Sequence, residues 1–146
     1  MYTEIYNPVC SNTECISVAV YDDTVGFLCY KSDEDYSPDD IATPVYTIEE
    51  SEHIVSCLDK AINVTEKDFR KDVSSICFCW NVDKPCQKLE ISALMCGSKS
   101  VLYYIESDVA YGDFDMVGGC MIGKPGLIKL KEAIQTAIRV IKNENT

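Results

Sequence analysis

Cysteine and histidine are the residue types that could act here as nucleophile, base or metal ligand. The chain has nine cysteines but a single histidine, His53, which lies between Glu52 and Ile54 in a stretch with helical periodicity. A Cys–His nucleophile pair stays an open alternative, because no local sequence favours one cysteine over another. Cys77 and Cys79 are two positions apart, which is not the spacing of a zinc knuckle, and no CxxC pair accompanies them. We therefore expect a surface histidine, no metal centre and no enzyme.

Two short stretches match parts of known binding loops. Gly118–Pro125 has the Gly-x4-Gly-Lys spacing of a phosphate-binding loop, but Pro125 stands where the magnesium-binding Ser or Thr belongs. Asp113–Gly118 has three positions of a calcium loop, but Lys124 occupies the twelfth position, where a bidentate glutamate is needed. Neither stretch predicts a cofactor, and a flexible lead into the last helix is the preferred interpretation of Gly118–Pro125.

Carboxylates give the strongest signal in the composition. The formal net charge is −11; residues 1–60 hold 13 acidic and 2 basic side chains, and residues 61–146 hold 11 of each. A field of this sign repels nucleic acid and anionic lipid and attracts basic proteins or cations, although solubility alone would also explain it. Lys31–Pro44 is rich in turn formers and predicts an exposed acidic loop. The residues that we expect to bind a partner there are Asp33, Glu34, Asp35, Tyr36, Asp39 and Asp40.

Two helices are predicted from apolar residues that recur three and four positions apart. The first begins after Thr47, whose hydroxyl can cap the amide of Glu50 while the Glu50 side chain reaches back, which is a capping box. A further helical turn, capped by Thr65, is expected within Asn63–Val73. The last helix begins near Pro125. Its apolar stripe consists of Leu127, Leu130, Ile134, Ala137 and Ile141, with Ile138 beside it.

Strands are predicted where apolar residues alternate. Cys15–Tyr30 forms a hairpin, and residues 74–107 form a three-stranded meander. Ser74–Asn81 is apolar on both faces, so it is expected to be a central strand of the only sheet. Tyr2–Asn12 predicts an irregular arm or a short edge strand, and Asp108–Gly126 a glycine-rich connection. The fold class is α+β: residues 1–146 form a single domain with a mainly antiparallel sheet of about five strands, in the order ββαβββα, and two helices mainly on one face.

The cysteines indicate a compartment. They lie mostly inside predicted strands or a helix, their number is odd, and no signal peptide or membrane-spanning segment precedes them. We therefore predict buried, reduced cysteines in a cytoplasmic protein.

These observations favour a small cytosolic interaction protein whose acidic N-terminal half docks a basic protein partner. An inhibitor or immunity protein for a basic toxin, such as a nuclease, is the concrete form of this hypothesis, because nucleases are cationic where they hold phosphates. Neither nucleic acid nor a membrane is an expected partner. One alternative is a ligand-binding or enzymatic domain that uses Asp108–Gly126. Another is a homo-oligomer, in which the basic face of the last helix meets an acidic face of a second copy.

Overall fold

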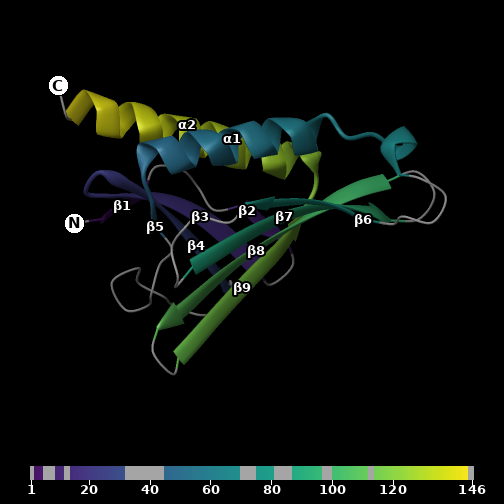
Figure 1. Cartoon of the computed structure of the whole chain (residues 1–146), viewed down its shortest axis with the longest axis horizontal. Coiled ribbons are helices and arrows are strands. Elements are labelled where there is room, and N and C mark those ends of the chain that lie inside the picture. The colour runs from purple at the N-terminus through teal and green to yellow at the C-terminus, as the bar shows by residue number, and fades with distance from the viewer. Residues whose placement is uncertain are drawn as a thin grey trace.

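The chain forms two antiparallel sheets and two α-helices, which confirms the α+β class. Figure 1 shows α1 (Ile48–Ile62) and α2 (Lys124–Glu144) side by side along one side of the molecule, over the strands. The computed structural model describes residues 2–4, 9–11, 14–31, 45–69, 75–80, 87–96, 100–111 and 114–144.

The strands of the described residues divide between two sheets rather than forming the single sheet that the sequence predicts. In sheet A, β3 pairs with its three neighbours β1, β2 and β4, and β5 pairs with β4. Sheet B has the order β6-β7-β8-β9. The bounds in sheet A are β1 (Tyr2–Glu4), β2 (Val9–Ser11), β3 (Glu14–Tyr21), β4 (Thr24–Lys31) and β5 (Val45–Tyr46). Those in sheet B are β6 (Ser75–Trp80), β7 (Gln87–Cys96), β8 (Ser100–Tyr111) and β9 (Phe114–Ile122).

The prediction that Ser74–Asn81 is a central strand is wrong, because β6 lies at an edge of sheet B. The strand that is covered on both faces is β3, in which every residue from Cys15 to Val20 is at most 6% exposed. Its second face carries the small side chains of Ser17 and Ala19, which make a doubly buried strand look amphipathic in the sequence.

The prediction that Asp108–Gly126 is a glycine-rich connection is also wrong for most of this range. β8 continues to Tyr111 and β9 occupies Phe114–Ile122, with Gly118 opposite Ser107 and Gly119 opposite Glu106. Glycine has a low strand propensity, but the pairing with β8 overrides it here. Gly118–Pro125 therefore contains the end of β9 and the beginning of α2, and it is not a flexible lead into the helix.

Both predicted helices are confirmed. The Glu50 amide donates to Thr47 Oγ1 at 3.1 Å, and the Thr47 amide donates to Glu50 Oε1 at 2.8 Å, which is the expected capping box. A short 3-10 helix, Glu66–Asp68, follows α1, and the Thr65 amide donates to the Asp68 carboxylate at its start. The apolar stripe of α2 is buried as predicted, in one hydrophobic cluster that contains residues of α1 and of both sheets.

We predict that Ile134→Ala lowers the free energy of unfolding by about 2–5 kcal/mol, because the Ile134 side chain is fully buried in α2 and its truncation leaves a cavity. Urea unfolding followed by circular dichroism measures the change. Ile128→Ala is the matched control on the same helix: Ile128 is 37% exposed, so its truncation should cost less than about 1 kcal/mol. Equal losses at the two positions would contradict the burial of the stripe.

Candidate interaction surface

The six residues that the sequence singles out for partner binding lie outside the described residues. Lys31 is the last residue of β4 and Val45 is the first residue of β5, so the acidic segment connects two strands of sheet A that pair with each other. The residues concerned are Asp33, Glu34, Asp35, Tyr36, Asp39 and Asp40, and their part in binding stays a prediction.

The described residues offer a different surface, the outer face of sheet B. Alternate residues of β7, β8 and β9, such as Ile91, Ile105 and Cys120, are buried in the core that the helices cover. The residues between them point to the opposite face and are partly exposed. We call this face the outer face; its described members are Glu90, Ser92, Leu94, Leu102, Tyr104, Glu106 and Met121.

The strand register places apolar side chains of the outer face together. Leu94 on β7 lies directly opposite Leu102 on β8. In the next row, Tyr104 lies opposite Ser92 on one side and Met121 on the other. Cross-strand neighbours on one face are within contact distance, so these side chains form a continuous patch. Aromatic residues and methionine are enriched in the cores of protein interfaces, whereas a purely solvated sheet face would be polar.

The next row of the outer face is acidic. Glu90 on β7 lies opposite Glu106 on β8, and the residue opposite Glu106 on β9 is Gly119, which contributes no side chain. The Tyr104 hydroxyl donates to Glu106 Oε2 at 3.2 Å and so orients that carboxylate beside the apolar patch. Two carboxylates on adjacent strands raise the negative potential of this row. The outer face therefore combines an apolar patch with an acidic border.

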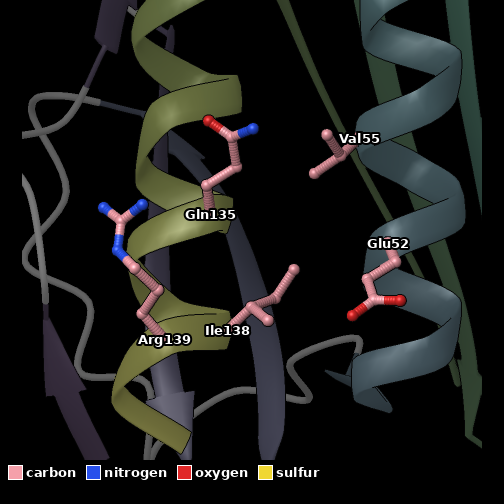
Figure 2. Close-up of a pocket in the computed structure, with 5 residues that line it drawn as sticks. All are labelled: Glu52, Val55, Gln135, Ile138 and Arg139. Atoms are coloured by element: carbon pink, nitrogen blue, oxygen red, sulfur yellow. The ribbon is translucent and has the colours of Figure 1, made fainter. Parts of the chain in front are cut away.

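A groove lies on the other side of the molecule, between α1 and α2. It has a volume of about 310 Å³. Figure 2 shows Val55 and Glu52 reaching from α1 toward Gln135 and Ile138 on α2, whereas Arg139 points away from α1. The groove is open to solvent and its polar groups do not converge on one point, unlike a site for a small ligand.

His53 and Cys57 on α1 form the one Cys–His pair among the described side chains. Cys57 Sγ lies 3.9 Å from His53 Nε2, as one turn of helix separates the two residues. Burial raises the pKa of the Cys57 thiol, and the nearby Lys60 charge opposes this effect. A raised pKa disfavours the thiolate, which is the form in which a cysteine acts as a nucleophile. Among the described residues, no group of three or more His, Cys, Asp or Glu could hold a metal ion.

The oxidation state of the cysteines differs in part from the prediction. Cys57 and Cys120 form no disulfide and are buried, as expected. Cys15, however, is disulfide-bonded. The prediction of reduced cysteines therefore does not hold for Cys15.

No helix in the described ranges is long and apolar enough to cross a membrane. No family model matches the sequence. No curated protein matches it either. The chain is similar in fold to the MRP1/MRP2 crystal structures from Trypanosoma bruciei: the TM-score is 0.53, the identity is 7%, and the match covers 100% of this chain and 87% of that chain. At this identity the likeness shows the fold alone.

Counting thiols tests the cysteine states. Because one disulfide occupies two of the nine cysteines, the denatured, unreduced protein should show at most seven reactive thiols, and the reduced protein nine. In the native protein Cys57 should react slowly, because its pKa is raised and its side chain is buried. Titration with a chromogenic disulfide reagent and peptide mapping measure both. Nine thiols without reduction, or rapid native labelling of Cys57, would contradict these assignments.

Proposed function

We propose that this protein is a small acidic interaction module that docks a basic protein partner on the outer face of sheet B. The observation that carries the proposal is the apolar patch around Leu102 and Tyr104 next to the opposed carboxylates Glu90 and Glu106. A partner that fits this surface presents apolar side chains at its centre and lysine or arginine at one edge. Such a composition gives affinity through the buried patch, and orientation through the charges.

The charge distribution supports a basic partner. The chain carries a net charge of −11, which steers cationic proteins toward it over a distance of several ångströms. Within the described part, Glu52 and Asp59 of α1 are already paired with lysines of α2. These ion pairs between α1 and α2 therefore neutralise part of the excess negative charge of residues 1–60. Glu90 and Glu106 lie outside these ion pairs.

An inhibitor or immunity protein for a basic toxin, such as a nuclease, is the concrete form of the proposal. A protein that binds a phosphate backbone must be cationic there, and an acidic surface can occupy the same site. A cytoplasmic location stays a prediction: the reduced state of Cys57 and Cys120 supports it, and the disulfide of Cys15 counts against it. The ligand-binding alternative loses the loop on which it depended, because Asp108–Gly126 is mostly strand.

A photo-crosslinking amino acid at position 104 identifies the partner. In extract from the native source, this variant should capture a basic protein, and a variant with the cross-linker at position 129 on α2 should not. With the purified partner, Tyr104→Ala should weaken binding by about 30-fold, the effect of truncating an aromatic hot spot. Capture at both positions, or unchanged affinity of Tyr104→Ala, would contradict docking on the outer face.

The acidic row is tested by Glu90→Gln combined with Glu106→Gln. Association should slow several-fold, and its dependence on salt should flatten, because two steering charges are lost. Stopped-flow kinetics at several salt concentrations measure both. Asp22→Asn combined with Asp23→Asn is the matched control: it removes the same charge from the exposed β3–β4 turn, where asparagine tolerates the positive φ of Asp22. Equal slowing by the control would mean that net charge, not this row, guides the partner.

The acidic loop has its own test. Converting Asp33, Glu34, Asp35, Asp39 and Asp40 to Asn or Gln should slow association several-fold and leave the free energy of unfolding nearly unchanged, since no secondary-structure pattern requires these charges. If the loop serves solubility alone, binding will be unchanged and aggregation near neutral pH will increase.

A further inference from the structure

The seam between α1 and α2 is closed by ion pairs that hold the two helices antiparallel. Lys142 on α2 donates to Glu52 Oε1 on α1 at 3.0 Å, and Lys131 pairs with Asp59 one helix turn from the other end of α1. These contacts fix which residues of the two helices lie at the same level. Glu52 is level with the C-terminal part of α2, and Asp59 is level with its N-terminal half.

Beside this seam, three charged side chains on the outward stripes of the helices have no ion-pair partner in the described part of the chain. Arg139 donates to Thr136 Oγ1, a neutral acceptor in its own helix. Lys60 and Glu132 are exposed and make no salt bridge with a described residue. Arg139 is one helical turn from Lys142, which pairs with Glu52, so Arg139 and Glu52 lie at similar positions along the helix pair. Glu132 and Lys60 lie at similar positions too, because they are the neighbours of Lys131 and Asp59, which pair with each other.

We propose that the outward face of the helix pair binds a second copy of this chain, with α1 of each copy lying on α2 of the other. A twofold axis parallel to the helices generates this arrangement and makes every contact occur twice. It brings Glu52 opposite Arg139 of the second copy, and Lys60 opposite Glu132 of the second copy. At one end of the face the acidic residue is on α1 and the basic residue is on α2; at the other end the signs are reversed. The same dimer brings opposite charges together at both ends.

Apolar side chains also favour a second copy of the chain as the molecule that binds to this face. The groove between the helices has Val55 and Ile138 on its walls (Figure 2). In the proposed dimer the grooves of the two copies face each other. Ile128 is 37% exposed and is the large apolar side chain of the described residues that is most open to solvent; it lies on the same outward stripe of α2 as Arg139. Closing the two grooves on each other removes these side chains from water.

The size of the face sets the strength of the dimer. Two helices of these lengths present roughly 500 Å² per copy, or about 1,000 Å² in total, which is at the small end of specific interfaces. The association is therefore weak and sensitive to salt, because its specific contacts are surface ion pairs. It uses the side of the molecule opposite the outer face of sheet B and does not rest on the proposed function.

Charge exchange between two variants tests this arrangement. Arg139→Glu places like charges against Glu52 of the second copy, and Glu52→Arg places like charges against Arg139. Each variant alone should dimerise at least tenfold more weakly than the wild type in sedimentation velocity experiments at low salt. An equal mixture of the two should recover the wild-type affinity to within about threefold, because both contacts then join opposite charges. Lys129→Glu is the matched control, because it makes the same change of charge on α2 outside the outward stripe that carries Ile128 and Arg139, and it should dimerise like the wild type.

Circular dichroism shows whether the variants are folded, and Lys60→Glu with Glu132→Lys provides a second pair for the same exchange. Loss in each variant alone together with recovery in the mixture supports α1-on-α2 pairing in particular. In a dimer with α1 on α1, each single variant would only replace one like-charge pair by another and would dimerise like the wild type. A wild-type protein that is monomeric up to about 200 μM at low salt would overturn the proposal. So would a mixture that dimerises no better than its components, or a loss at Lys129→Glu equal to that at Arg139→Glu.

Discussion

The burial of the apolar stripe of α2 is the interaction on which the rest of the structure depends. Leu130, Ile134 and Ala137 are almost completely buried, and they belong to a hydrophobic cluster that includes Ile16 and Val18 of sheet A and Ile105 of sheet B. The described strands of the two sheets do not pair with each other, so the relative position of the sheets depends on the packing of side chains, much of it against this helix. α1 then adds its own buried face and is joined to α2 by ion pairs along the seam. The helices cover one face of sheet B, and the side chains on its other face are partly exposed.

The helices could be predicted from the sequence because their signals are local. A capping box and an apolar spacing of three and four positions involve residues that are close in the chain. Together they were sufficient to predict α1, and the apolar spacing was sufficient to predict α2. The strands depend on partners that are far away. Ser17 and Ala19 make the doubly buried β3 resemble an amphipathic strand, whereas the cysteines of β6 make an edge strand resemble a buried one. The glycines of β9 hide a strand that exists only because β8 pairs with it. Propensity is a weak guide where cross-strand packing decides.

The candidate surface, too, could be predicted only in part from the sequence. The excess of negative charge was visible in the composition, and it directed attention to an acidic segment between β4 and β5. The alternation in β8 already placed Leu102, Tyr104 and Glu106 on one face. The sequence alone could not show that Leu94 lies opposite Leu102, or that Glu90 lies opposite Glu106, because the register of β7 against β8 is a tertiary property. A patch becomes recognisable only when the neighbours on adjacent strands are known.

The asymmetry of charge along the chain is partly an internal arrangement. Folding brings the basic α2, from the half of the chain with no net charge, against the acidic α1, so that Lys131 and Lys142 neutralise Asp59 and Glu52. The helix face is then a mosaic of both signs, which suits a surface that is complementary to itself. The outer face of sheet B carries Glu90 opposite Glu106, which suits the basic partner that we propose. The two surfaces lie on opposite layers of the molecule (Figure 1), so a dimer formed through the helices would present two outer faces to its surroundings. A partner that is itself dimeric, or present at high local density, would then be bound more tightly than either single contact allows, because the second contact forms at high effective concentration.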